Sequence, residues 1–322
     1  MLSDVLKAKL VLITGKGGVG KTSFSCALGR ALAQKQKKVL IVEFDNFNSV
    51  LEPIFSIKST YIHKEIEPQL FVCNVTWQEA LRDWLQQIVK SKRIVKRILN
   101  NKIAMIYLDV TPGAREIVIL SKIIRFLQTY DHVIVDLPAS GHALGILKVP
   151  ITAKKLMRTG PVHEKSVEIL EVLSQETTLP IVVSLPEEMV VNETLELKEQ
   201  IERELPFLKK PKVILNKAST ASFSKEEDVL LKALSDKIQN HPENKPFVLA
   251  GFLEKELEHA THLALQKIEE GYAQKALFFP RMGVLEGIGI NHSKGSNRSN
   301  KQSLNNHRIV VDQMTSFIHK HL

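Results

Sequence analysis

The chain has 322 residues, of which 44% are hydrophobic and 25% are charged, and its formal net charge is +9 at pH 7. These values are typical of a globular protein that buries a sizeable core, as one large α/β domain or two small ones. Its two cysteines are too few for a disulfide framework, and no apolar run approaches the ~20 residues that a membrane-spanning helix needs. Because the N-terminus also shows no cleavable signal pattern, we expect a cytoplasmic protein.

The first predicted elements surround a glycine-rich loop. Residues 9–14 predict a short buried strand, and residues 22–34 predict a helix. The loop between them reads Gly15-Lys16-Gly17-Gly18-Val19-Gly20-Lys21-Thr22. A strand, a glycine loop and a helix in this order are the context of a phosphate-binding loop. The alternative is a glycine-rich turn without a chemical role.

The chemistry of this loop follows from its residue types. Glycines let backbone N–H groups approach a phosphate closely, and these groups form an anion cradle together with the helix N-terminus. Lys21 adds a point charge for the outer phosphates, and Thr22 places a hydroxyl where Mg²⁺ would lie. The predicted nucleotide-binding residues of this region are Gly15, Gly17, Gly18, Val19, Gly20, Lys21, Thr22 and Ser23.

Two further strands are predicted over residues 38–43 and 69–75. The first is apolar enough for the centre of a parallel sheet. It delivers Asp45 and Asn46 to the carboxyl end of the strand, where open α/β sheets bind ligands. Asp45 is therefore a candidate catalytic residue. The alternative for this aspartate is a helix cap at the end of the strand.

A helical insertion is predicted at about residues 76–128. Its middle contains no acid between residues 84 and 108, whereas it contains the basic residues Lys90, Lys92, Arg93, Lys96, Arg97 and Lys102. Such a run is either a solvated helix face or a contact for an anionic partner through residues 90–102.

The next motif is a strand that ends in an acid. Residues 130–136 predict a buried strand whose last residue is Asp136, which is the Walker B pattern. This carboxylate would hold Mg²⁺ through a water, near the hydroxyl of Thr22. Gly141 and His142 follow in the next loop. A lone histidine more often has a structural role, and a structural role is therefore the alternative to a functional one for His142.

The remaining strands are predicted over residues 181–184, 212–217 and 247–253. The second of them contains Asn216 near its end. A GTP-binding protein would place an aspartate three residues later, to pair with guanine, but the residue there is Ser219. Because Asn216 can still hydrogen-bond adenine, ATP is the predicted nucleotide.

The sequence predicts three parts along the chain. Residues 1–285 form a phosphate-loop ATPase domain, residues 286–307 a flexible basic linker, and residues 308–322 a C-terminal amphipathic helix. The apolar stripe of this helix either docks on the core or touches a membrane, and docking is the favoured alternative.

Lys16 follows the first glycine of the loop directly, which is uncommon in phosphate loops. This pattern resembles the deviant Walker A loop of the group that contains the ArsA-type arsenite-pump ATPases, the tail-anchored-protein targeting ATPase, and the MinD and ParA ATPases. Two more segments resemble the ArsA family within that group. Residues 136–144 are similar to its switch II, and residues 186–194 are similar to its Pro-Glu-x-Met-x-x-x-Glu-Thr segment.

The resemblance implies a P-loop NTPase fold, with a mostly parallel, doubly wound sheet flanked by helices, and Mg²⁺-dependent ATP hydrolysis by a homodimer. Lys16 would reach the nucleotide of the partner subunit, whereas the alternative is a solvated loop lysine. Asp45 would orient the attacking water, Gly141 would approach the terminal phosphate, and His142 would couple its loop to the nucleotide state. Glu116 matches an acid of the family pattern, although the helix dipole equally explains an acid in a first helical turn.

The chain also departs from the family pattern. Asn46 replaces a proline after Asp45, and Pro138 lies one position early in the switch II segment. The Cys-x-x-Cys zinc pair of the targeting ATPases and the metalloid-binding cysteines of the arsenite pumps have no counterpart. We therefore expect neither zinc nor arsenite to bind.

Two functions are predicted from these features. The first is an ATPase whose homodimer opens and closes to act on a protein partner that the sequence does not identify. The second is a positioning ATPase whose ATP-bound dimer binds a membrane or another anionic surface through residues 90–102 or 308–322. A nucleotide binder that has lost turnover is a further alternative.

Overall fold

The computed structural model of the protein describes residues 2–46, 48–58, 60–89, 91–103, 105–106, 111, 113–220, 223–237, 245–281 and 296–322. Within these ranges, eight strands form one sheet in the order β3-β4-β2-β5-β1-β6-β7-β8. The strands are β1 (Leu10–Thr14), β2 (Val39–Phe44), β3 (Lys64–Glu67), β4 (Leu70–Val75), β5 (His132–Asp136), β6 (Thr178–Ser184), β7 (Lys212–Ala218) and β8 (Leu277–Pro280). Neighbouring strands run parallel except β3 and β4, which are antiparallel.

The central strands are rich in apolar residues because both faces of the sheet are covered. β1 reads Leu-Val-Leu-Ile-Thr and is buried at every position. Since side chains alternate between the faces, Leu10 and Leu12 belong to the core on one side, and Val11 and Ile13 belong to the core on the other. Continuous apolar runs of this kind are typical of strands in a parallel sheet.

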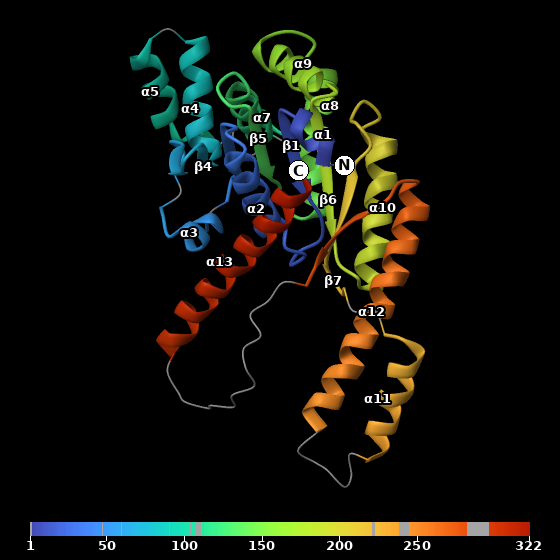
Figure 1. Ribbon diagram of the computed structural model, residues 1–322. Coiled ribbons are helices and arrows are strands. Elements are labelled where there is room, and N and C mark those ends of the chain that lie inside the picture. The colour runs from blue at the N-terminus through green and yellow to red at the C-terminus, as the bar shows by residue number, and fades with distance from the viewer. Residues whose placement is uncertain are drawn as a thin grey trace.

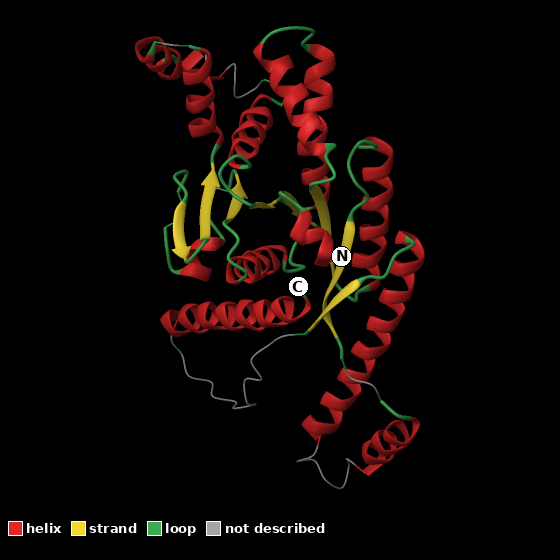
Figure 2. Ribbon diagram, turned by 45° about the horizontal axis from the view of Figure 1, so that its top comes forward, coloured by secondary structure: helices red, strands yellow, loops and turns green. Residues whose placement is uncertain are grey.

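Helices cover both faces of the sheet, and Figure 2 shows the strands between two helical layers. One core lies under α4, α7, α8, α9 and α10, a second lies under α2, α3 and α13, and a smaller one lies among β7, α10 and α12. The predicted doubly wound, mostly parallel fold is thus confirmed. The helices with described bounds are α1 (Leu2–Lys7), α2 (Lys21–Gln34), α3 (Leu51–Phe55), α4 (Trp77–Ile88), α5 (Lys92–Asn100), α7 (Ala114–Phe126), α8 (Ser140–Leu156), α9 (Pro161–Leu173), α10 (Glu188–Glu204), α11 (Lys225–Lys237), α12 (Lys245–Tyr272) and α13 (Ser296–His321).

Two pairs of helices project from the central layers at opposite ends of the molecule. α4 and α5 extend beyond β4, whereas α11 and the first half of α12 extend from the end where β7 lies (Figure 1). α4, α5 and α7 all come between β4 and β5 in the chain, where the helical insertion is predicted. Among the described residues, no helix has both the length and the apolar character that crossing a membrane requires.

The C-terminal helix α13 docks along α2. Its apolar stripe is buried there, with Val311, Met314 and Ile318 at most 2% exposed. Phe317 packs on Phe279 of β8, with the ring centroids 5.0 Å apart. The apolar stripe of residues 308–322 therefore faces the protein core.

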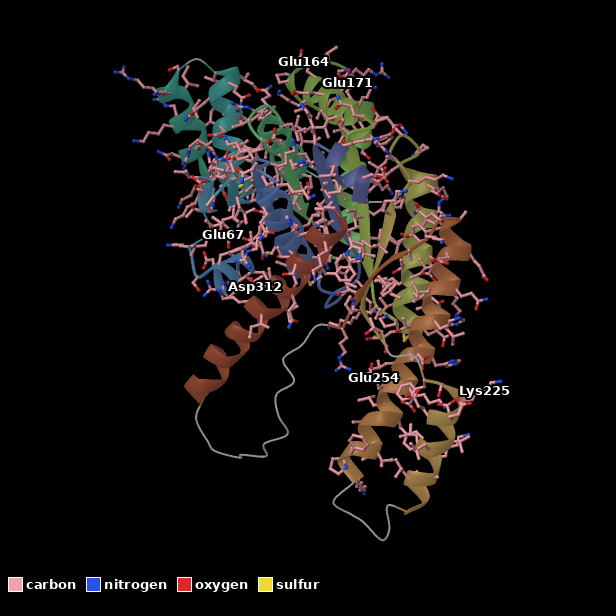
Figure 3. The ribbon with its side chains drawn as sticks, viewed as in Figure 1. Glu67, Glu164, Glu171, Lys225, Glu254 and Asp312 are labelled. Carbon is pink, nitrogen blue, oxygen red and sulfur yellow. The ribbon has the colours of Figure 1, made fainter. Side chains whose placement is uncertain are left out.

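A buried arginine adds polar contacts to this docking. Arg30 of α2 is 9% exposed and forms ion pairs with Glu67 of β3 and Asp312 of α13. Figure 3 shows the two carboxylates near the junction of these elements. Because a charge in such a position needs partners, Arg30 links the C-terminal helix to the sheet edge.

The linker predicted over residues 286–307 differs from the structure in its second half. Residues 286–295 lie outside the described residues, whereas residues 296–307 already belong to α13. Once the following turns have docked, each further residue adds one hydrogen bond to an existing helix, so a polar segment can continue it.

The strand predicted over residues 247–253 is wrong, because these residues lie in α12, a helix of 28 residues. A short apolar run does not distinguish a strand from a buried helix turn. Within this helix, a Cβ on Gly251 would lie 2.7 Å from Cδ1 of Leu231, so the glycine lets α12 approach α11 closely. The last strand of the sheet is β8, which the sequence analysis misses.

Candidate active site

The phosphate loop joins the carboxyl end of β1 to the first turn of α2. Gly15 has a φ of 143°, and a Cβ there would lie 2.2 Å from the carbonyl oxygen of Val183 on β6. Gly20 has a φ of 94°, and a Cβ there would lie 2.5 Å from Nδ2 of Asn216. Both positions therefore require glycine, as expected for a loop that curls tightly around an anion.

Open space lies in front of this loop. A Cβ added to Gly17, Gly18 or Gly141 would meet no atom within 4 Å. Gly141 belongs to the first turn of α8, which is tied to the loop because the N–H of Ser140 donates to the carbonyl oxygen of Gly15 at 3.2 Å. The structure thus brings Gly141 to the phosphate loop and leaves room there for a phosphate.

The ammonium of Lys21 folds back onto its own loop. Its Nζ donates to the carbonyl oxygens of Gly15 and Lys16, at 3.1 and 2.9 Å. Burial lowers the pKa of this ammonium, while the charges of Asp136 and Glu193 act in the opposite direction. A bound phosphate would give Lys21 an anionic partner in place of the two carbonyl groups.

Thr22 and Asp136 meet on the wall of a cavity of 410 Å³. The hydroxyl of Thr22 donates to Oδ2 of Asp136, and the hydroxyl of Ser25 lies 3.5 Å from Oδ1. Burial raises the pKa of Asp136 from the usual 3.8 to about 6, although the Thr22 hydrogen bond and the Lys21 charge lower it. A hydroxyl and a carboxylate side by side in a polar cavity fit Mg²⁺, which takes oxygen ligands and keeps several waters.

Residues from separate motifs come together at this cavity. Its walls include the predicted residues Lys21, Thr22, Asp45, Glu116, Asp136 and His142. His142 is exposed in the first turn of α8, and Glu116 lies in the first turn of α7. The carboxyl ends of β1, β2 and β5 supply the rest, because these strands are parallel neighbours in the sheet.

Asp45 has two neighbours at the end of β2. Its φ of 47° is in the left-handed region, which residues other than glycine rarely adopt. Its Oδ1 accepts a hydrogen bond from the N–H of Trp77, the first residue of α4, at 3.1 Å. Asp45 therefore caps helix α4, which is the alternative role that the sequence predicts for it. The same residue also lines the phosphate cavity, and its role toward water stays a prediction.

Asn216 is hydrogen-bonded to the backbone of the phosphate loop. It is 6% exposed, and its Nδ2 donates to the carbonyl oxygen of Val19 at 2.8 Å. The structure therefore places Asn216 at the loop, and its contact with adenine stays a prediction. Ser23 follows Thr22 in the first turn of α2.

Lys16 lies at the rim of the loop. Its side chain is 37% exposed, and its Nζ lies 3.3 Å from a carboxylate oxygen of Glu193 on α10. The loop therefore carries two lysines in different settings. Lys21 is bound to the loop itself, whereas Lys16 is half-exposed and paired with another helix.

Comparison with known proteins places this site in a family. A sequence model of the ArsA ATPases, described as anion-transporting ATPases, matches residues 8–224. This span contains the phosphate loop, Asp45, Asp136 and Asn216, and it is more than half of the chain. The chain belongs to the ArsA family of ATPases.

Individual relatives agree with this assignment. The chain is 27% identical over 312 residues to the ATPase BagA of Mycobacterium tuberculosis, covering 88% of this chain and 89% of the relative. It is 32% identical over 158 residues to an ATPase ASNA1 homolog of Entamoeba dispar, covering 46% and 48% of the two chains. It is 29% identical over 160 residues to an arsenical pump-driving ATPase of Acidiphilium multivorum, covering 47% and 27%.

Two carboxylates of this ArsA-family ATPase carry contacts that sequence reasoning missed. Glu43 on β2 is 1% exposed and accepts a hydrogen bond from the N–H of Val50 at 2.6 Å, next to the start of α3. An acid inside an apolar strand is the signal that could have revealed it. Glu193 lies within a segment of the family pattern, but its contacts with Lys16 and Ser140 depend on the fold.

Binding of preformed MgATP should release about half a proton per protein molecule at pH 6 and almost none at pH 8. The pKa of Asp136 is about 6 without the metal, so about half of its carboxyl groups carry a proton at pH 6. A carboxyl group that holds Mg²⁺, whether directly or through a water, must lose that proton when the ion binds. Isothermal titration calorimetry in buffers with different ionisation enthalpies measures this count.

The Asp136→Asn variant is the control, because it has no carboxyl proton to release. An equal proton count for the variant and the unmodified protein would contradict the assignment.

The raised pKa of Asp136 also means that the folded nucleotide-free protein holds this proton more tightly than the unfolded chain. The contribution of Asp136 to the free energy of unfolding therefore falls as the pH rises from about 4 to about 6, and bound Mg²⁺ would offset the loss.

Proposed function

We propose that this ArsA-family ATPase hydrolyses ATP with Mg²⁺ as a homodimer that holds nucleotide between its two copies. We further propose that the opening and closing of the dimer act on a protein partner. One observation supports the proposed dimer. Lys21 is already bound to the phosphate loop of its own chain, whereas the Lys16 side chain lies half-exposed at the rim of the same loop. A half-exposed lysine at that rim can reach a nucleotide held by a second copy once it leaves Glu193.

Each residue of the site then has a task. The loop N–H groups and Lys21 bind the phosphates, and Thr22 and Asp136 would hold Mg²⁺. The bound metal supplies positive charge that neutralises the phosphate oxygens. Asp45 would hold a water in line with the terminal phosphate. Lys16 of the partner subunit would add charge where negative charge develops in the transition state.

Asp45 also supplies a link from the nucleotide to the helical insertion. Its carboxylate caps α4 through the N–H of Trp77, at 3.1 Å. Arg115 of α7 lines the phosphate cavity as well, and its guanidinium lies over the Trp77 ring at 4.9 Å from the centroid. If Asp45 turned toward a water, α4 would lose its cap. Hydrolysis would in this way change the first turn of the insertion.

An apolar cavity of 320 Å³ adjoins that turn, and it favours the proposal of a protein partner. Its lining includes Trp77, Leu81, Trp84, Val118, Leu156 and Met157, from α4, α7 and α8 and the residue after α8. Leu156 is 73% exposed and Met157 is 46% exposed. Apolar side chains that open to the surface beside a nucleotide-sensitive turn favour an apolar segment of another protein as the ligand.

The dependence of the ATPase rate on protein concentration tests the dimer. A site completed by a second chain should give a specific activity that rises with concentration and levels off when dimers predominate. Over the same range, sedimentation should show a larger fraction of dimers with MgATP than without nucleotide. A constant specific activity from a protein that stays monomeric in MgATP would contradict the proposal.

A second candidate function is the binding of an anionic surface by the ATP-bound dimer. The described basic residues of α5 are Lys92, Arg93, Lys96 and Arg97. Ile94 of the same helix is 52% exposed, and Lys90 lies outside the described residues. Basic and apolar side chains exposed on one helix are typical of contact with an anionic lipid surface. Because α13 buries its apolar stripe, α5 is the surface that favours this alternative.

Vesicle sedimentation separates the two functions. Under the second, the protein should pellet with anionic vesicles in MgATP at low salt, and the double variant Arg93→Gln with Arg97→Gln should pellet several-fold less. The matched control is Lys154→Gln with Arg158→Gln, which removes two exposed basic residues, one in the last turn of α8 and one just after that helix. Equal pelleting with anionic and neutral vesicles would remove this candidate.

A further inference from the structure

Lys16 is already engaged within its own chain. Its Nζ lies 3.3 Å from Oε2 of Glu193, and both side chains are slightly more than one third exposed, at 37% and 36%. The other carboxylate oxygen of Glu193 accepts a hydrogen bond from Oγ of Ser140, at 2.7 Å. Ser140 is in turn tied to the loop, since its N–H donates to the carbonyl oxygen of Gly15. Glu193 thus connects the phosphate loop, the first turn of α8 and α10.

The position of Glu193 on α10 is fixed by the residues beside it. Thr194 is 4% exposed, and its hydroxyl bonds to the hydroxyl of Ser184 at 2.9 Å and to the carbonyl oxygen of Val190 at 2.8 Å. The carbonyl oxygen of Thr194 accepts a hydrogen bond from the hydroxyl of Tyr272 at 3.1 Å. The turn that carries Glu193 is thus anchored, and Ser140 also holds its carboxylate, which favours the Lys16 side chain as the part of the pair that moves.

We propose that Glu193 is a positioning residue that holds Lys16 in its own chain in the open state and releases it when the dimer closes on nucleotide. The inference rests on the proposed dimer. One ammonium cannot pair with Glu193 of its own chain and reach the phosphates of the partner subunit at the same time. Closing therefore exchanges a carboxylate partner for a phosphate, which carries more negative charge. Without nucleotide, the exchange has no such gain, and Lys16 stays on Glu193.

The size of the effect follows from the exposure of the pair. A partly exposed ion pair shifts an equilibrium by a factor of about two to five. Since two such pairs open in each closing dimer, the factors multiply to about 4- to 25-fold in the dimer dissociation constant. This range is wide enough for sedimentation to resolve, and small enough that nucleotide can overcome it.

The test measures the dimer dissociation constant by sedimentation in Mg²⁺ and a nonhydrolysable ATP analogue. Glu193→Gln should lower this constant about 4- to 25-fold, because the lysine loses its charged partner while the glutamine oxygen can still accept from Ser140. Glu188→Gln is the matched control, since Glu188 lies on the same helix and pairs with Lys267 at the same 3.3 Å. It should leave the constant unchanged.

A second background makes the test specific to Lys16. In Lys16→Ala there is no lysine to release, so adding Glu193→Gln should have no further effect on the constant. An unchanged or higher constant for Glu193→Gln alone would overturn the inference, as would an equal decrease in the Lys16→Ala background. Failure of the unmodified protein to dimerise with the analogue would instead refute the proposed dimer, so the two failures are distinguishable.

Discussion

Replacement of Lys16 with alanine should lower the turnover number for ATP by about 10²- to 10³-fold, while the dissociation constant for MgATP changes only a few-fold. Binding in one chain depends on the loop and on Lys21, whose ammonium lies at the carbonyl groups of Gly15 and Lys16. The charge of Lys16 would act only when a second copy closes over the nucleotide. Phosphate release at saturating ATP and titration with a fluorescent ATP analogue measure the two quantities.

Two further variants are compared with Lys16→Ala. Lys37→Ala removes an exposed lysine just beyond the C-terminal end of α2 and should change neither quantity. Lys16→Arg keeps the charge but not the compact ammonium, so it should retain only part of the rate. Turnover at the unmodified level in Lys16→Ala would show that this lysine has no role in catalysis.

The Asp45→Asn substitution should lower the turnover number by about 10²- to 10⁴-fold with little change in MgATP binding, because a neutral amide holds and orients the attacking water less well than a charged carboxylate. The folding stability should stay near that of the unmodified protein. The asparagine Oδ1 can still accept the N–H of Trp77, and asparagine tolerates the left-handed φ of 47° at this position. Phosphate-release assays and thermal unfolding measure the two effects.

Asp45→Ala separates catalysis from capping. It removes both the carboxylate and the cap on α4, so it should lose turnover and also about 1 kcal/mol of folding stability. If Asp45→Asn released phosphate at the unmodified rate and only Asp45→Ala differed in stability, Asp45 would be a helix cap without a catalytic role.

The features that could be predicted from the sequence depend on neighbouring residues. The phosphate loop occupies one uninterrupted segment between a buried strand and a helix, so Gly15, Gly20 and Lys21 are placed by local geometry. Asp136 could be predicted because it ends an apolar strand. Since this strand is a parallel neighbour of β1, its carboxyl end lies beside the phosphate loop.

The features that could not be predicted depend on contacts between distant segments. The run at residues 247–253 belongs to α12, which approaches α11 closely at Gly251 and Leu231, and no local pattern reveals that contact. The cap from Asp45 to Trp77 likewise requires β2 and β4 to be parallel neighbours. The pairing of Lys16 with Glu193 depends on the placement of α10 beside the phosphate loop.

Mixing Lys16→Ala with Asp45→Asn shows directly whether one copy supplies a lysine to the nucleotide of the other. In a mixed dimer, the Lys16→Ala chain keeps its own Asp45 and would receive Lys16 from the Asp45→Asn partner, which gives one complete site. The mixture of two inactive variants should recover about a quarter of the unmodified rate, because about half of the dimers are mixed and each has one complete site of two. If Lys16 served only the nucleotide of its own chain, the mixture would be as inactive as its parts.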